Sequence, residues 1–161
     1  MNEVYLCLGG NLGDRKNNLK KAVELINYEI GEVILQSKIY ETASWGIESQ
    51  ANYLNQVIKI KSDQGPKQLL DKALSIEEKI GRTRTIKWES RLIDIDILFF
   101  NNEIIQQEGL MIPHPYLQDR KFVLIPLVEI APFFAHPISK LTMTKLLAAC
   151  NDELLVRMYC F

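Results

Sequence analysis

The amino-acid sequence predicts an α+β fold in one domain, with an antiparallel sheet and two helices on one of its faces. Residues 4–8 and 93–97 alternate side chains with a period of two, as β-strands do. Residues 14–31 and 65–81 repeat apolar side chains every three or four positions, as amphipathic helices do. A chain of 161 residues can bury one hydrophobic core and is short for two. We therefore expect a single domain over residues 1–161.

The first strand and the first helix have clear end signals. The strand at residues 4–8 stops at Gly9 and the glycine after it, which is typical of a strand that ends in a tight turn. Asp14 can cap the helix that follows, and Gly31 comes directly after its last apolar residue. Turn formation alone explains the glycines at this point.

Two further strands and a second helix complete the predicted core. The β-rich stretches at residues 33–42 and 53–60 indicate the second and third strands. Gly65, followed by a proline, opens a helix that Gly81 can end, and residues 92–100 form the fourth strand. The resulting order, βαββαβ, is that of ferredoxin-like folds, with both helices on one face of the sheet.

Residues 101–161 are expected to form a C-terminal extension to this core. Two prolines hold His114 in an extended loop, which favours a structural role over a catalytic one. Residues 122–128 resemble a strand, and residues 141–149 favour a short helix.

The charge balance argues against nucleic-acid and membrane-surface partners. The chain has 19 basic and 20 acidic residues and a formal net charge of −1, so any bound anion must be held by a local cluster. Residues 1–5 do not begin a signal peptide, and no apolar run is long enough for a membrane span. Cys7, Cys150 and Cys160 fit neither a zinc site nor a disulfide framework. We expect a monomeric cytoplasmic protein with reduced cysteines.

The segment at residues 81–97 carries the strongest chemical signal. Four cations come first: Arg82, Arg84, Lys87 and Arg91. A period of two then places Asp94 and Asp96 on one strand face, with Cα atoms about 6–7 Å apart. The isoleucines at positions 93, 95 and 97 lie on the other face. Paired carboxylates suit Mg²⁺, which adds substrate phosphates to one or two carboxylates, and arginines bind phosphate bidentately. The alternative is a solvated strand face after a basic loop.

Glu77 and a set of aromatic residues remain open on spacing alone. Glu77 falls on the apolar stripe of the second helix, where it is either buried against a partner such as Arg82 or a metal, or turned to water. Tyr53 and Asn55 share a strand face. With Phe122 they could bind a flat aromatic ligand by stacking and hydrogen bonding, although aromatic residues on strands are usually core.

Short motifs follow one another along most of the chain. They are Leu8-Gly9-Gly10-Asn11-Leu12-Gly13, Tyr40-x-Thr42, Gly46, Tyr53-Leu54-Asn55, Arg82-x-Arg84, Trp88, Arg91-Leu92-Ile93-Asp94-Ile95-Asp96-Ile97-Leu98, Pro113-His114-Pro115, Arg120-x-Phe122-Val123-Leu124 and Pro126-Leu127-x-Glu129-Ile130-Ala131-Pro132. Together they resemble the 6-hydroxymethyl-7,8-dihydropterin pyrophosphokinases. The resemblance implies transfer of pyrophosphate from ATP to 6-hydroxymethyl-7,8-dihydropterin, giving the pterin diphosphate and AMP in folate biosynthesis.

The same resemblance implies a role for each candidate residue. Asp94 and Asp96 would bind two Mg²⁺ ions at the ATP phosphates, on which Arg82 and Arg91 would act during transfer. The other implied ATP-binding positions are Glu77, Arg84, Trp88, His114 and Arg120, with Arg84 and Trp88 on a mobile catalytic loop. The implied pterin-binding positions are Thr42, Gly46, Tyr53, Asn55 and Phe122, with the ring stacked between Tyr53 and Phe122.

Some positions depart from the family pattern, and other function classes remain as rivals. Gly10 stands where a serine is usual, Ser44 replaces a proline and Tyr116 replaces an arginine. A ferredoxin-like nucleic-acid-binding module would use the sheet aromatics and the basic loop, but the chain lacks the RNP1 signature and the basic balance of such modules. A nucleotide-binding protein without catalysis is the second rival, and the intact pair Asp94 and Asp96 argues against it.

Overall fold

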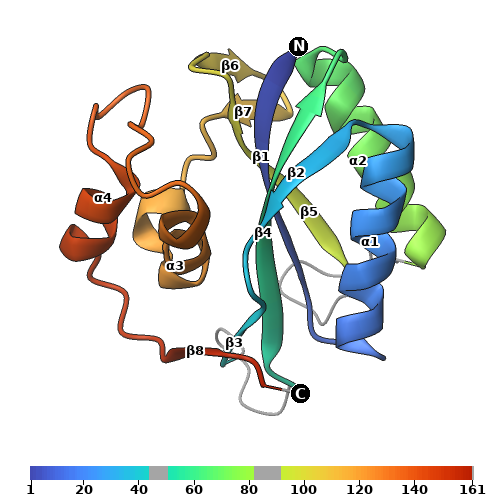
Figure 1. Cartoon of the computed structure of the whole chain (residues 1–161), viewed down its shortest axis with the longest axis horizontal. Coiled ribbons are helices and arrows are strands. Elements are labelled where there is room, and N and C mark those ends of the chain that lie inside the picture. The colour runs from blue at the N-terminus through green and yellow to red at the C-terminus, as the bar shows by residue number, and fades with distance from the viewer. Residues whose placement is uncertain (44–50, 82–91, 161) are drawn as a thin grey trace.

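The computed structural model describes residues 1–43, 51–81 and 92–160, and these form a mixed α/β protein (Figure 1). The sheet strands are β1 (Asn2–Gly10), β2 (Glu32–Gln36), β3 (Tyr40–Thr42), β4 (Tyr53–Ser62), β5 (Asp94–Phe100) and β8 (Val156–Met158). A separate hairpin consists of β6 (Ile105–Gln107) and β7 (Leu110–Ile112). The helices are α1 (Arg15–Glu29), α2 (Pro66–Ile80), α3 (Lys121–Ile130) and α4 (Met143–Ala149), with a 3₁₀ turn, η1, at Leu117–Asp119.

An antiparallel sheet forms the centre of the molecule. Its hydrogen-bonded order is β5-β1-β4-β3-β8, and β2 pairs with β4 beside β3. The stretch predicted as one strand at residues 33–42 is two strands because the ladder breaks at Ser37. The Ser37 hydroxyl accepts the Val57 N–H at 3.0 Å, while the Ser37 carbonyl accepts the Gln56 side chain at 2.8 Å. Strand β1 therefore lies between β4 and β5.

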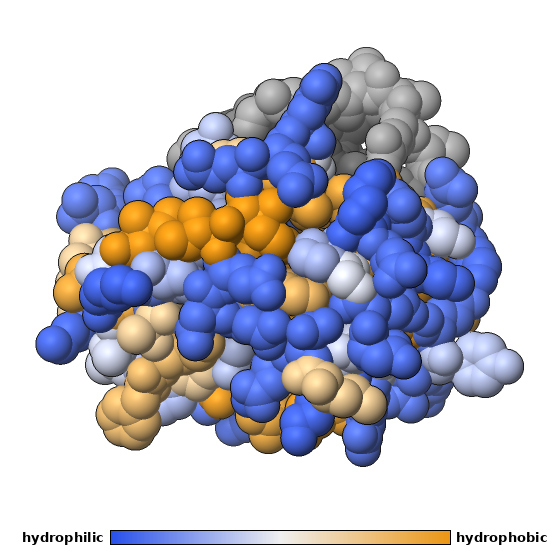
Figure 2. Space-filling model, turned by 90° about the horizontal axis from the view of Figure 1, so that it is seen from above, coloured by the Kyte–Doolittle hydropathy of each residue, from blue (hydrophilic) through white to orange (hydrophobic). Residues whose placement is uncertain are grey.

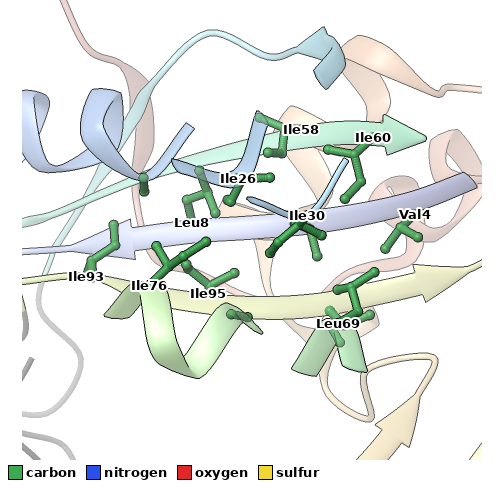
Figure 3. Close-up of a cluster of buried hydrophobic side chains, with 14 of the residues drawn as sticks. Val4, Leu8, Ile26, Ile30, Ile58, Ile60, Leu69, Ile76, Ile93 and Ile95 are labelled. Carbon is green, nitrogen blue, oxygen red and sulfur yellow. The ribbon is translucent and has the colours of Figure 1, made fainter. Parts of the chain in front are cut away.

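Helices α1 and α2 cover one face of the sheet, as predicted (Figure 1). Asp14 caps α1 by accepting the Asn17 N–H at 3.1 Å, and Gly81 ends α2 in the left-handed region with φ of 108°. Figure 3 shows the core between these layers, formed by Ile26, Ile30, Leu69 and Ile76 on the helical side and by Val4, Leu8, Ile58, Ile60, Ile93 and Ile95 on the sheet side. Burying this face fixes which side chains of each strand point the other way.

Helices α3 and α4 lie on the opposite side of the sheet (Figure 1). The prediction of a strand at residues 122–128 is wrong, because this stretch is part of α3. Its buried residues Val123, Leu124 and Leu127 follow helical spacing, but the residues between them are also apolar and hide the period. Helix α4 begins two residues later than predicted and ends at the predicted residue. The Thr142 hydroxyl caps it by accepting the Lys145 N–H at 3.2 Å.

The hairpin β6–β7 and the strand β8 were not predicted. Each of these strands has three residues, which is too short for a period of two to be recognised. From above, the surface is mainly hydrophilic, with one hydrophobic band and smaller hydrophobic patches elsewhere (Figure 2). Within the described ranges, no helix has both the length and the apolar character required to cross a membrane.

Candidate active site

Asp94 and Asp96 lie on the sheet face opposite the α1–α2 core. Ile93, Ile95 and Ile97 are buried in that core, whereas the two aspartates are half-buried on the other side of the strand. The predicted division into an apolar and an acidic face is therefore present. Both carboxylates are thus placed so that their oxygens can act as ligands of a cation bound on this face.

The acidic pair suits a cation that is shared with a substrate. In the described part of the chain, no three His, Cys, Asp or Glu side chains come together as a metal cluster. Two carboxylates from one strand leave most of an octahedral shell to water or phosphate oxygens, which is how Mg²⁺ is usually held.

The register of the sheet brings Asp94 into line with Asn55. Gly9 on β1 pairs with Asp94 on one side and with Asn55 on the other, and Tyr40 on β3 pairs with Asn55. Neighbouring strands are about 4.8 Å apart, so the backbones of Asp94 and Asn55 are about 10 Å apart. A Cβ atom on Gly9 would lie 2.3 Å from Asn55 Nδ2, so only glycine leaves room for this amide. The glycine therefore shapes the site as well as the turn.

Glu77 is buried and holds the strand that carries the aspartates. Its side chain is 2% exposed, and its Oε1 accepts the Ile95 N–H at 2.8 Å. Among the described strands β5 lies at the sheet edge, so the carboxylate of Glu77 takes the place of a strand partner for this outward N–H. The alternatives left open for Glu77 are thus resolved in favour of burial, and its carboxylate fixes the residue between Asp94 and Asp96.

His114 is held neutral beside Asp94. The His114 N–H donates to the Leu98 carbonyl at 3.1 Å, and the Tyr116 N–H donates to His114 Nδ1 at 3.2 Å. Burial, reinforced by the positive charge of Arg120, lowers the pKa of His114 to about 4, while Asp94 acts in the opposite direction. His114, Arg120 and Asp94 are therefore close enough to influence one another.

Arg120 lies between two aromatic rings. Its guanidinium carbon is 5.5 Å from the centroid of Tyr116 and 5.7 Å from that of Phe122. Phe122 was predicted to open a strand, but it stands at the start of α3. These contacts orient a positive charge next to the His114–Asp94 end of the site.

Thr42 has a buried hydroxyl that the described part of the chain leaves without a hydrogen-bond partner. The residue is 3% exposed, and its Oγ1 has no partner among the described residues. Tyr53 pairs with Thr42 across β3 and β4 and is half-buried. An unpaired buried hydroxyl is costly in a free protein and is easily explained by a ligand that bonds to it.

Cys7 lies beneath the site and was not predicted to be near it. It pairs with Asp96 across β1 and β5 and is buried. Burial, together with the carboxylates of Asp96 and Asp94, raises the pKa of the Cys7 thiol, and Asn55 makes a side-chain hydrogen bond with it. Cys7 is thus a neutral part of the site floor. Knowledge of the β1–β5 register would have revealed it.

Five predicted site residues lie outside the described residues: Gly46, Arg82, Arg84, Trp88 and Arg91. Of the others, Glu77 lies in α2 and Phe122 at the start of α3. The rest fall into two groups on one sheet face and its adjoining segment. Asp94, Asp96, His114 and Arg120 belong to the β5 end, and Thr42, Tyr53 and Asn55 belong to β3 and β4.

Comparison with known proteins gives a consistent family. The model of the 7,8-dihydro-6-hydroxymethylpterin-pyrophosphokinase family matches residues 5–132. The 2-amino-4-hydroxy-6-hydroxymethyldihydropteridine pyrophosphokinase of Aquifex aeolicus is 44% identical over 138 residues, which cover 86% of this chain and 86% of that protein. The protein of the same name from Bacillus subtilis is 44% identical over 130 residues, which cover 80% of this chain and 78% of that protein.

Solved structures give the same fold. The HPPK-DHPS of Plasmodium falciparum with pteroate matches with a TM-score of 0.76 at 19% identity, over 92% of this chain and 44% of that chain. The same protein with SDX-DHP matches with a TM-score of 0.73, over 92% of this chain and 43% of that chain. This chain thus spans less than half the length of those proteins.

Proposed function

Because the chain belongs to the 7,8-dihydro-6-hydroxymethylpterin-pyrophosphokinase family, it transfers pyrophosphate from ATP to 6-hydroxymethyl-7,8-dihydropterin in folate biosynthesis, and we propose that one sheet face binds both substrates. The nucleotide phosphates lie at the β5 end of this face. The pterin lies at the β3–β4 end. The pairing of Asp94, Gly9 and Asn55 across three strands is the observation that carries this arrangement.

Asp94 and Asp96 hold Mg²⁺ at the phosphate end, with two ions proposed. When bound, the metal neutralises charge on the phosphate oxygens and fixes their geometry. Glu77 keeps the two aspartates in place through its bond to the strand between them. His114 and Arg120 contact the nucleotide, and the contacts of Arg120 with the rings of Tyr116 and Phe122 orient its charge.

Four further residues complete the proposed phosphate end. Arg82 and Arg91 stabilise charge on the transferred group, because guanidinium groups pair bidentately with phosphate. Arg84 and Trp88 contact ATP. All four lie shortly before β5 in the sequence, which supports this placement.

Asn55 and Thr42 recognise the pterin edge, and two aromatic rings stack on its faces. Asn55 offers both a donor and an acceptor, and the buried Thr42 hydroxyl gains a partner. Tyr53 and Phe122 supply the stacking faces, and backbone near Gly46 completes the subsite. The half-buried positions of both rings leave part of each available for contact.

In the proposed reaction, the pterin hydroxymethyl oxygen attacks the β-phosphorus of ATP in line. A bond forms between that oxygen and phosphorus, the hydroxyl proton is lost, and the β-phosphorus separates from the bridging oxygen that leaves with AMP. The chain contributes mainly by placing the two substrates and by offsetting negative charge.

Finer features of the protein complete the proposal. The order β5-β1-β4 followed by β2 and β3 supports a ferredoxin-like core with a C-terminal extension, in one domain over residues 1–161. We place the enzyme in the cytoplasm, where ATP is available. We propose a monomer, because strands of one chain supply both ends of the site.

Product identification tests this function directly. The protein is incubated with Mg·ATP and the reduced hydroxymethylpterin, and the nucleotide and pterin products are separated and quantified. We expect AMP and pterin diphosphate in equal amounts. ADP would indicate ordinary kinase chemistry, and substrate binding without any product would indicate a protein that has lost catalysis.

A further inference from the structure

Tyr40 and Glu129 are motif residues without a role in the site so far, and the fold joins them. The Tyr40 hydroxyl donates to Glu129 Oε1 at 2.6 Å, across 89 positions in the sequence. The Lys38 N–H donates to both carboxylate oxygens of Glu129, at 3.1 and 3.0 Å. The end of α3 is therefore bonded to the start of β3.

The Tyr40–Glu129 bond has the geometry of a charge-assisted hydrogen bond. Hydroxyl-to-carboxylate distances of about 2.5–2.7 Å are typical of such bonds, which are stronger than neutral ones. Burial first, and then the bond and charge of Glu129, raise the pKa of Tyr40 to about 12. Tyr40 therefore stays protonated, and can donate this bond, at pH values well below 12.

Helix α3 crosses the row of residues that forms the proposed site. Arg120 at its start lies near Asp94, since both act on the pKa of His114, and Glu129 near its end bonds to Tyr40. Nine helical residues rise about 13.5 Å. The row from Asp94 to Tyr40 covers three strand spacings, or about 14 Å. The length of the helix thus matches the width of the row.

The middle of α3 packs on the sheet through a buried apolar cluster. Val123, Leu124 and Leu127 lie in one buried cluster with Cys7 and Val57 of the sheet. Apolar contacts are not directional, so they allow a helix to slide or rotate by small amounts. The hydrogen bonds of Glu129 are directional, so they can fix the position of α3 on the sheet.

We propose that Tyr40 and Glu129 are positioning residues of the pterin subsite. By fixing α3 on the sheet, they set the distance between Phe122 on the helix and Tyr53 and Asn55 on β4. Tyr40 is itself the cross-strand partner of Asn55, so the same residue aligns both sides of the subsite. This inference rests on the proposed pterin-binding role of those residues.

The Tyr40→Phe variant tests the inference, because it removes one hydroxyl and keeps the ring. We expect the Kd and KM for the pterin to rise about fivefold or more, while the Kd for ATP and kcat stay within about twofold. Tyr28→Phe is the matched control, since Tyr28 is 88% exposed on α1, and it should change none of these values. A lower melting temperature with unchanged pterin affinity would overturn the positioning role.

A double-mutant cycle shows whether the two residues act together. Glu129→Ala should weaken pterin binding at least as much as Tyr40→Phe, and Glu129→Gln, which keeps an acceptor oxygen, should be milder. Adding Tyr40→Phe to Glu129→Ala should cause no further loss. Independent, additive losses would contradict the inference. If the wild-type protein bound no pterin, the proposed function would fail, and this inference with it. If the wild type bound pterin normally and the Tyr40→Phe variant did so equally well, only the positioning role of Tyr40 and Glu129 would be rejected.

Discussion

At the scale of single residues, substitution of Thr42 distinguishes a binding role of its hydroxyl from a structural one. Its hydroxyl is buried without a partner among the described residues, and such a group destabilises a free protein by about 1–3 kcal/mol. We predict that Thr42→Val leaves the free energy of unfolding unchanged or raises it by about 1 kcal/mol, since valine has a similar shape and no polar group. The same variant should weaken pterin binding about five- to tenfold. Urea unfolding and equilibrium binding measure both effects.

Thr142 provides the matched control. Its hydroxyl caps α4 by accepting the Lys145 N–H at 3.2 Å, so Thr142→Val should lower the free energy of unfolding by about 1 kcal/mol without changing pterin affinity. A loss of stability in Thr142→Val without one in Thr42→Val would exclude a general response to the substitution. A clear loss of stability in Thr42→Val would show that its hydroxyl has a structural partner.

His114 makes the stability of the protein depend on pH. Burial and Arg120 lower its pKa from 6.5 to about 4, so between these values the unfolded chain binds a proton that the folded chain does not. Stability is therefore full above about pH 6.5 and is lost as the pH falls toward 4, by on the order of 2–3 kcal/mol. Between pH 7 and pH 5 this contribution is about 2 kcal/mol, and we predict that His114→Gln removes it from the difference in unfolding free energy. His136 and the carboxylates account for the pH dependence that remains in the variant. An equally steep pH dependence in the variant would contradict the assignment to His114.

The aspartate pair is predicted to serve turnover and not pterin binding. Asp94→Ala or Asp96→Ala should lower kcat/KM by at least about a hundredfold, or about 2.7 kcal/mol, because each removes a ligand of the metal at the phosphates. Pterin affinity without ATP should remain close to that of the wild type. Asp71→Ala, which removes an exposed partner of Lys67 on α2, is the control and should have full activity. Turnover within about tenfold of the wild type in either site variant would reject the metal-ligand role.

At the scale of elements, the sequence predicted those parts of the fold in which periodicity and end signals agree. Helices α1 and α2 were predicted because Asp14 and Gly81 mark ends of clear apolar stripes. Helix α3 was mistaken for a strand because every residue from Phe122 to Val128 is apolar, so the helical spacing of the buried positions does not show in the sequence. Short strands that pair through backbone atoms leave no side-chain pattern at all.

From the sequence, the site could be predicted within each strand but not across neighbouring strands. The period of two correctly separated Asp94 and Asp96 from the isoleucines, since this depends on local geometry. The contact between Gly9 and Asn55, and the bond from Glu77 to Ile95, depend on the register between elements far apart in sequence. No single-strand pattern contains that information.

Helix α3 also carries the prediction for the stacking ring. Phe122→Ala should weaken pterin binding by about 1–3 kcal/mol, the range for loss of one stacking face, and should leave the Kd for ATP nearly unchanged. Phe133→Ala is the control, because Phe133 is 85% exposed just after the same helix, and it should have no effect on either affinity. A fall in melting temperature with unchanged pterin affinity would mean that Phe122 is a core residue.

At the scale of the whole molecule, the two faces of the sheet have different tasks. The face under α1 and α2 is an apolar core, and burying it sets the register of β5, β1 and β4 (Figure 3). The opposite face receives the side chains left over by that register, among them Asp94, Asp96 and Asn55. Stability and chemistry therefore come from alternate residues of the same strands, and the site cannot be moved without repacking the core.

An isotope experiment tests the central claim, attack of the pterin oxygen on the β-phosphorus, most directly. The reduced hydroxymethylpterin is labelled with ¹⁸O in its hydroxymethyl group, turned over with Mg·ATP, and both products are analysed by mass spectrometry. The account predicts that all label stays in the pterin diphosphate, between carbon and phosphorus, and that AMP contains none. Label in AMP, or loss of label from the pterin product, would show that a different bond is made or broken and would contradict the account.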